Sequence, residues 1–142
     1  MKKILLLLAN GFEIFEASAF IDVFGWNLVE GDNSTELFTC GPRKEIKSSF
    51  NQRIIVDHLI GDIDIGSFDA LVIPGGFEEY GFYQDAYKDE FLNVIRGFKA
   101  NDKFIASICV GALPMGKSGV LKDKNGTTYP NPVRQEIGRA HV

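Results

Sequence analysis

Three short stretches of the chain are almost wholly apolar, without alternating polar positions. They are Ile4 to Leu8, Ala70 to Ile73 and Phe104 to Ile108, and each ends at a turn that contains glycine. A strand covered by helices on both faces has this pattern, because neither of its sides meets solvent. The three stretches are therefore predicted to be strands of a parallel sheet, the first of them within Lys2 to Ala9.

Helical periodicity follows two of these predicted strands. Apolar residues recur at Phe12, Phe15, Ala19 and Val23 after the first strand, and at Phe91, Val94, Ile95 and Phe98 after the second. The second segment begins with two acidic residues and has basic residues toward its end, as the helix dipole favours. This alternation predicts an α/β fold, a doubly wound and mostly parallel sheet with flanking helices, of the flavodoxin-like kind.

Two further segments, residues 36–40 and 53–57, are predicted to be a strand and a short β excursion. In open α/β sheets, ligands bind beyond the carboxyl ends of the strands. Candidate chemistry is therefore expected in residues 9–16, 74–79 and 109–112.

The composition indicates one ordinary domain of 142 residues, 45% of them hydrophobic, with a formal net charge of −4. No run of Lys or Arg is longer than two, so neither nucleic acid nor an anionic membrane surface is expected as a partner. No segment approaches the ~20 apolar residues of a membrane span. The apolar N-terminus is interrupted by Asn10, Glu13 and Glu16, where a signal peptide would remain apolar.

The two cysteines, Cys40 and Cys109, lie far apart and have no metal-ligand spacing, which favours a reduced, cytoplasmic protein without a metal or other cofactor. Cys40 lies within a predicted strand and is expected to be a buried core residue. His58 is expected to be a surface or hydrogen-bonded loop residue rather than a partner of Cys109.

Cys109 stands where the third predicted strand ends. The segment Ala106 to Gly111 places it between an apolar strand and a helix-capable stretch of small residues, which is the layout of a nucleophile elbow. Such a turn holds the nucleophile in a strained conformation, facing the start of the next helix. Because the N–H groups of a helix N-terminus can favour a thiolate, Cys109 is the candidate nucleophile.

Two other segments supply groups that a nucleophile requires. Gly75 and Gly76 follow the second strand, and their N–H groups, with that of Val110, are predicted to form an oxyanion hole. Glu16 lies near the start of the first predicted helix. If it is partly buried beside a thiolate, its carboxyl group is expected to have a raised pKa and to transfer a proton; the alternative from periodicity alone is a solvated acid on the helix face. Glu13 is expected to be a solvated acid.

The segment Gly111 to Ser118 also matches the phosphate-binding pattern G-x-x-x-x-G-K-[ST] after a strand. That motif requires a long helix to begin at Lys117, whereas Gly119 and Asn125-Gly126 interrupt the chain soon afterwards. The alternative is a helix over 111–118 that Gly119 caps. A nucleotide site is therefore disfavoured.

Four segments together resemble the ThiJ/PfpI family, the group that contains the Parkinson's-associated protein deglycase, within the class I glutamine amidotransferase-like fold. They are Gly11 to Glu16, Asp69 to Gly76, Ala106 to Gly111 and Gly126 to Pro130. Their order and spacing match the family from Met1 to about Pro130.

The resemblance implies that Cys109 is the nucleophile, Glu16 its partner acid, and Gly75, Gly76 and Val110 the surrounding amides. It also implies a homodimer. The family's activities range from glyoxalase or deglycase chemistry on small carbonyls to peptide hydrolysis, isocyanide hydration and redox-sensing chaperone roles.

The sequence departs from the family at two positions. Peptidase-like members have histidine directly after the cysteine, where Val110 stands, and deglycase-type members have one where Tyr129 stands. Peptide hydrolysis by a Cys-His dyad is therefore not expected, glyoxalase chemistry is less favoured, and Tyr129 is kept only as a neighbour of the site. The expected activity is attack by a Glu16-assisted Cys109 thiolate on a small reactive carbonyl. The alternative is a non-catalytic thiol that senses oxidation.

Residues 136–142 fit no element of the family and resemble translated adapter sequence, so the domain is expected to cover 1–135. The last strand and helix of the family would then be missing. This predicts an uncovered sheet edge or a helix-binding face.

Overall fold

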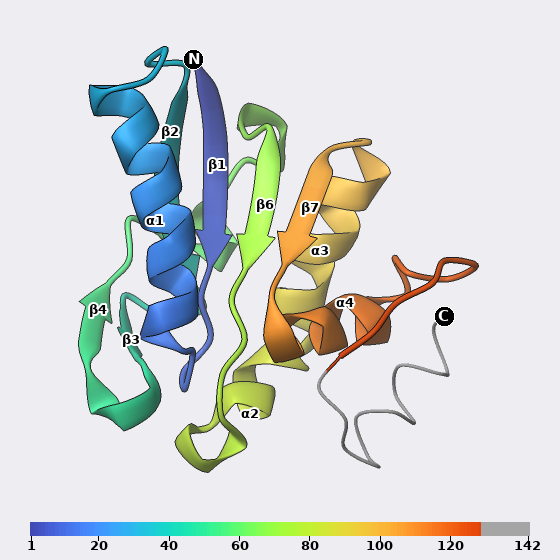
Figure 1. The fold of residues 1–142 in the computed structure, drawn as a ribbon. Helices are drawn as coiled ribbons and strands as arrows, with labels where there is room; N and C mark the ends of the chain where they lie inside the picture. The colour runs from blue at the N-terminus through green and yellow to red at the C-terminus, as the bar shows by residue number, and fades with distance from the viewer. Residues whose placement is uncertain (129–142) are drawn as a thin grey trace.

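The computed structural model describes residues 1–128, which form a five-stranded sheet in the order β5-β2-β1-β6-β7 with helices on both faces (Figure 1). The strands are β1 (Lys2–Leu7), β2 (Thr35–Gly41), β5 (His58–Leu59), β6 (Ala70–Ile73) and β7 (Phe104–Ser107). All their pairings are parallel, as the apolar stretches predicted. The predictions for Tyr129 and for residues 136–142 lie outside the described residues.

The α-helices of the described residues are α1 (Ile14–Val29), α2 (Phe82–Ala86), α3 (Asp89–Ala100) and α4 (Ala112–Ser118). Helix α1 crosses the front of the sheet over β1 and β2, and α3 lies behind β6 and β7 (Figure 1). Strands β3 (Glu45–Lys47) and β4 (Arg53–Ile55) form a separate antiparallel hairpin. The arrangement confirms the predicted doubly wound α/β fold.

Helix α3 buries the apolar stripe that its sequence predicts. Phe91, Val94, Ile95 and Phe98 are all buried, and they pack in one cluster with Leu5, Leu7, Leu71 and Ile73 of the sheet. Acidic residues occupy the first turn of α3 and Lys99 its last turn. The predicted helix and its buried face are therefore both confirmed.

Helix α1 turns a different stripe toward the sheet from the one that marked it as a helix. Phe15 and Val23 are 83% and 65% exposed. Ala17 is buried instead, and Phe20 and Phe24 pack against the sheet cluster that contains Leu6. Because α1 is apolar on several sides, the spacing of its apolar residues indicates a helix but does not select the side that packs.

Strand β7 has one apolar face that the described residues leave open. Phe104 and Ile108, on the α1 side of the sheet, are 84% and 40% exposed, and Ala106 between them is exposed as well. The alternate residue Ile105 packs toward the α3 cluster. Within residues 1–128, β7 pairs only with β6. Strand β7 is therefore the last strand on this side of the sheet within the described residues, and the prediction of an uncovered edge, which depends on the C-terminal residues, stays a prediction.

Candidate active site

Cys109 occupies the turn between β7 and the short helical segment η5 (Cys109–Gly111), which leads into α4. Its φ is 54°, in the left-handed region that costs a residue with a β-carbon about 1–2 kcal/mol. The residue is exposed. A β-carbon added to Gly111 would lie 2.6 Å from the carbonyl oxygen of Ile73, so glycine is needed for this turn to pack against the end of β6. The predicted elbow is present.

Gly75 lies where three predicted site residues meet. A β-carbon added to it would lie 2.8 Å from Glu16 Oε1 and 3.0 Å from the backbone nitrogen of Val110. The side chain of Cys109 is within hydrogen-bonding range of the Glu16 carboxyl group. The structure therefore brings Cys109, Glu16, Gly75 and Val110 together from three separate segments at the carboxyl edge of the sheet.

Glu16 lies in the first turn of α1, and burial raises the pKa of its carboxyl group above 4.5. The Cys109 side chain and the Gly75 backbone partly oppose this shift, while the charge of Glu13 adds to it. Oε1 is buried and makes no hydrogen bond of good geometry among the described residues. A carboxyl group in this environment keeps a proton to higher pH than an ordinary glutamate, as the sequence predicted.

Gly76 belongs to a pairing between two of the loops. An added β-carbon would lie 2.3 Å from the carbonyl oxygen of Gly11, and Gly76 forms an antiparallel bridge with Phe12. The N–H of Phe77 donates to Gly11 at 2.9 Å, and the N–H of Glu13 donates to Gly75 at 2.8 Å. The start of α1, which carries Glu16, is thereby fixed against the glycine turn.

Glu13 is not the solvated acid that the sequence suggested. It is the N-cap of α1, and its Oε1 accepts a hydrogen bond from the N–H of Phe15 at 3.4 Å. Its Oε2 accepts from the hydroxyl of Ser49 at 3.2 Å. A residue that precedes the helix satisfies otherwise unpaired N–H groups there, so Glu13 connects α1 to the β3–β4 hairpin.

Sequence reasoning missed the buried Asp85 in α2. Its carboxylate accepts hydrogen bonds from the Arg43 guanidinium at 2.7 and 2.9 Å and from the N–H of Asn10 at 2.8 Å. Burial alone would raise the pKa of Asp85, but these bonds outweigh it, and the pKa lies below 3.8. Asp85 therefore ties together the loops that follow β1 and β2. A single acid in a short amphipathic segment gave no signal of this role.

The segment that matched the phosphate-binding pattern is helical. Helix α4 spans Ala112–Ser118 and ends at Gly119, whose φ is 92°. The ammonium group of Lys117 lies 5.1 Å from the centre of the Tyr87 ring. A phosphate cradle needs a loop whose N–H groups converge, and here a helix takes its place. The alternative prediction, a helix capped by Gly119, is confirmed.

The other two residues considered in the sequence, Cys40 and His58, pack within the fold. Cys40 is fully buried in the core, where burial raises the pKa of its thiol to about 12. His58 is half-buried in β5, with its ring 5.6 Å from that of Phe38 and 5.8 Å from that of Phe68. It therefore lies within an aromatic cluster of the sheet, and not in a loop as predicted.

Within residues 1–128, no group of three or more His, Cys, Asp or Glu side chains is placed to hold a metal ion. None of the helices in that part of the chain is long and apolar enough to cross a bilayer.

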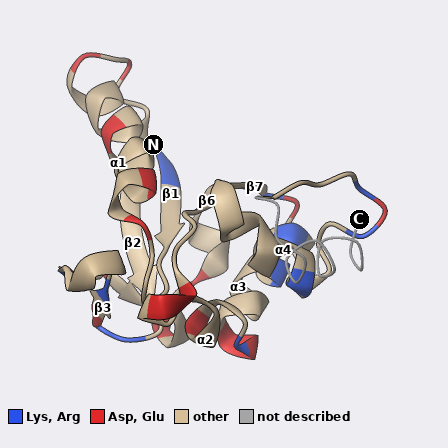
Figure 2. Cartoon of the chain, turned by 60° about the horizontal axis from the view of Figure 1, so that its bottom comes forward, with Lys and Arg blue, Asp and Glu red and all other residues tan. Residues whose placement is uncertain are grey.

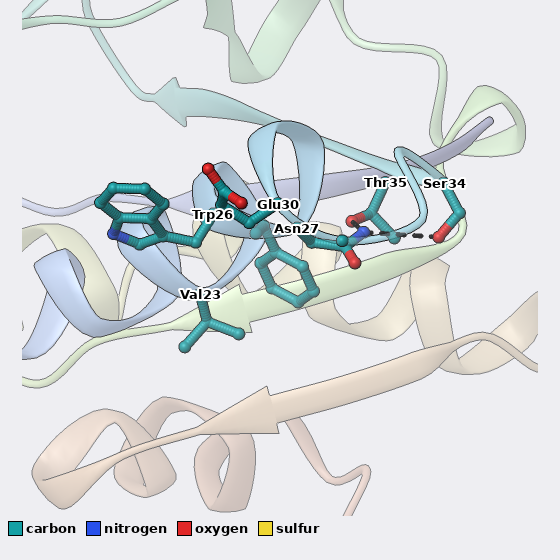
Figure 3. Close-up of a pocket in the computed structure, with 8 residues that line it drawn as sticks. Val23, Trp26, Asn27, Glu30, Ser34 and Thr35 are labelled. Carbon is teal, nitrogen blue, oxygen red and sulfur yellow. Dashed lines mark hydrogen bonds between the residues drawn. The ribbon is translucent and has the colours of Figure 1, made fainter.

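A groove of about 560 Å³ opens beside the C-terminal half of α1, where Val23, Trp26 and Asn27 line it (Figure 3). Asn27 donates hydrogen bonds to Ser34 and Thr35 there. Ten residues of helix, about 15 Å, separate Trp26 from Glu16, so this groove is distinct from the site at Cys109.

Comparison with known proteins gives a consistent match. Residues 2–141 match the profile of the DJ-1/PfpI family. The Bacillus subtilis protein YraA is 30% identical over 136 residues, which cover 96% of this chain and 76% of YraA. Deglycase PH1704 of Pyrococcus horikoshii is 27% identical over 128 residues, covering 90% of this chain and 72% of that protein.

Among solved structures, the DJ-1 superfamily protein Atu0886 from Agrobacterium tumefaciens superposes with a TM-score of 0.76. It is 24% identical, and the match covers 99% of this chain and 73% of that one. The likeness shows that the two chains share a fold.

Proposed function

The chain belongs to the DJ-1/PfpI family, and from this premise we propose that it is an enzyme whose Cys109 thiolate attacks small reactive carbonyl compounds. The observation that carries the proposal is the meeting of an exposed, strained cysteine with the half-buried Glu16 carboxyl group at Gly75. A nucleophile beside a group of raised pKa has the two components of covalent acid-base catalysis.

In the first step, the Glu16 carboxylate accepts the thiol proton, and the sulfur of Cys109 forms a bond to the carbonyl carbon. The electron pair of the C=O π bond moves to oxygen, which then takes the proton back from Glu16, giving a hemithioacetal. Within residues 1–128, the N–H of Gly76 donates to no backbone carbonyl, while the Gly75 backbone hydrogen-bonds to the Glu16 carboxyl group. We propose that the N–H groups of Gly76 and Val110 stabilise the oxyanion, with the N–H of Gly75 beside them.

With a 1,2-dicarbonyl substrate, the adduct is converted to product without an external oxidant. A proton leaves the carbon bonded to sulfur and a proton is returned to the neighbouring carbon, while the hydroxyl proton of the first carbon passes to the oxygen of the second. The first carbon thereby becomes a thioester carbonyl and the second carries a hydroxyl group. Water then cleaves the carbon–sulfur bond and regenerates the thiol. For methylglyoxal, the sum is one molecule of aldehyde and one of water giving lactate and one proton.

The first test is turnover of methylglyoxal by the purified chain, measured as lactate formed. We expect multiple turnovers, and we expect one equivalent of iodoacetamide to stop them while labelling Cys109 in peptide mass spectra. The buried Cys40 is an internal control that should remain unlabelled. Labelling of Cys109 with full retention of turnover would refute the proposal.

Replacing Glu16 by Gln should lower kcat/KM by about 10²-fold, because general acid-base groups contribute roughly that much or more. The wild-type kcat/KM should decline as the pH falls through the Glu16 pKa, which lies above 4.5, and the E16Q variant should lack this acidic limb. Glu13→Gln is the matched control. It keeps the capping oxygen but removes the charge that raises the pKa of Glu16, so the limb should move to lower pH. An acidic limb that persists unchanged in E16Q would assign it to another group.

A second candidate is a redox sensor that uses the same thiol, and the exposure of Cys109 favours it. Two molecules of hydrogen peroxide would oxidise the thiolate first to a sulfenate and then to a sulfinate, each releasing one water. A protonated Glu16 would donate a hydrogen bond to that sulfinate. Stoichiometric oxidation without turnover of any carbonyl would favour this function over the enzyme.

We also propose that the chain forms a homodimer and works in a reducing compartment. Exposed apolar residues of α1, among them Phe15, Trp26 and Val29, support a homodimer with a second copy of the chain. The chemistry requires a reduced cysteine, which supports a reducing compartment such as the cytoplasm.

A further inference from the structure

The tip of the β3–β4 hairpin holds an aromatic residue whose conformation and exposure are both unfavourable. Phe50 has a φ of 65° and lies in the segment η1 (Ser49–Asn51). Glycine or asparagine is the usual residue in that left-handed region, because a bulky side chain crowds the backbone. The Phe50 side chain is also 64% exposed, so little burial compensates. Strained residues of this kind occur preferentially at functional sites.

Buried hydrogen bonds hold this tip in place. Ser48 and Ser49 are both buried, and the N–H of Ser49 donates to the carbonyl of Phe12 at 2.8 Å. The N–H of Asn51 donates to Ser48, and the Ser49 hydroxyl donates to Glu13. The turn that strains Phe50 is therefore fixed to the loop that leads into α1.

Phe50 forms an aromatic ledge with two residues that follow the glycine turn, Phe77 and Tyr80. Its ring centre lies 6.4 Å from that of Phe77 and 5.5 Å from that of Tyr80, with the latter pair edge to face. The side chain of Phe77 is 43% exposed. The ledge therefore consists of three rings, and the two apolar ones, Phe50 and Phe77, are exposed to solvent.

The ledge adjoins the proposed active site. Phe77 is two residues, at most about 7.6 Å between α-carbons, from Gly75, the residue at which Glu16 and Val110 meet. Glu78 and Glu79 are exposed between the rings of Phe77 and Tyr80 in the sequence. Acidic residues gather around α2, and basic residues lie in residues 43–47 beside β3 at the same end (Figure 2). The exposed carboxylates of Glu78 and Glu79 would repel an anionic substituent next to Phe77, whereas an uncharged aromatic one would not be repelled.

We infer that the aromatic ledge of Phe50, Phe77 and Tyr80 is a subsite for an uncharged aromatic or planar apolar substituent on the carbonyl compound that Cys109 attacks. This inference rests on the proposed function. Ring-on-ring contact at a fixed ledge would select substrates by their substituent, whereas the thiolate and Glu16 act on the carbonyl group that all of them share.

The test compares kcat/KM for phenylglyoxal, which carries a ring, with that for methylglyoxal, which does not. Phe50→Ala should lower the value for phenylglyoxal about tenfold and leave methylglyoxal within about twofold, as expected for loss of one aromatic contact. Phe50→Asn should do the same and raise the Tm, because asparagine tolerates the left-handed conformation. The control is Phe104→Ala, which removes an exposed ring five residues, about 17 Å, from Cys109 along β7.

A second measurement is independent of turnover. The quantity compared is the rate at which N-phenyl-iodoacetamide alkylates Cys109, divided by the rate for iodoacetamide. This ratio should be higher in the wild type than in F50A. Light scattering follows the oligomeric state of both proteins. If no carbonyl is turned over but this preference persists, the proposed function fails and the subsite stands. The subsite would be overturned if F50A changed kcat/KM equally for phenylglyoxal and methylglyoxal, and changed the alkylation rate equally for the two iodoacetamides. A change in mass without a change in preference would overturn it too, and would assign Phe50 to an interface between copies.

Discussion

Cys109→Ser is expected to lower kcat/KM for methylglyoxal by about 10³-fold or more, because a serine hydroxyl stays neutral at pH 7 and is a far weaker nucleophile than a thiolate. Glu16 cannot activate the serine, because a carboxylate is too weak a base to remove the proton of a hydroxyl group. The two side chains are nearly equal in size, so the fold should be retained. The measurement is lactate formation at pH 7, beside a circular dichroism melt.

Cys109→Gly separates loss of activity from loss of structure. Glycine adopts the left-handed conformation without the crowding that a β-carbon causes, so this variant should gain about 0.5–1 kcal/mol in free energy of unfolding. It should nevertheless be inactive. Cys40→Ala is the opposite control, because a cavity in the buried core should lower the Tm while kcat/KM at low temperature is retained. Turnover by C109G would end the proposal that this sulfur is the nucleophile.

Asp85→Asn should lower the free energy of unfolding by about 2–3 kcal/mol at pH 7, the range for hydrogen bonds to a charged, buried group. The variant keeps the shape of the side chain but loses the charge that two Arg43 nitrogens contact. Urea unfolding gives the measurement. Since Asn10 and Arg43, in the loops after β1 and β2, both hydrogen-bond to Asp85, kcat/KM for methylglyoxal should also decline in folded protein.

The pH dependence of this loss has a defined sign. The folded-state pKa of Asp85 lies below its ordinary value of 3.8, so its contribution is complete well above that pH and disappears as the pH falls through the folded-state pKa. The difference between wild type and D85N should therefore be full at pH 6 and shrink below about pH 3.8. Glu45→Gln, in the exposed pair with Arg53 at 3.7 Å, should cost less than about 0.5 kcal/mol. Equal losses in the two variants would contradict the role given to Asp85.

The apolar strands and α3 were predictable because the pattern of apolar residues within each segment reflects which of its sides are buried. The stretch Ala70 to Ile73 coincides with β6, and the stripe from Phe91 to Phe98 is the buried face of α3. The position of Cys109 in a turn between a strand and a helix was predictable for a similar reason. A turn between a strand and a helix is a local feature, and small residues such as Gly111 are needed there.

Contacts between distant segments were not predictable in the same way. The periodicity of α1 marked a helix, but the sheet receives Phe20 and Phe24, while Phe15 lies outside. Glu13 became a helix cap through its backbone position and through Ser49, which is 36 residues away. The pair of Arg43 with Asp85 spans 42 residues, and nothing near either residue indicates the other.

The sequence alone therefore determined the parallel α/β architecture, the elbow at Cys109 and the glycines beside it, since steric and hydrophobic requirements act within a few residues. Only the tertiary structure decided which face of α1 is buried, how Asp85 holds the loops, and that Phe50 stands beside Phe77 and Tyr80. Those features depend on which surfaces come into contact when the chain folds. The free energy of such a contact is determined by two distant segments together, so neither segment alone predicts it.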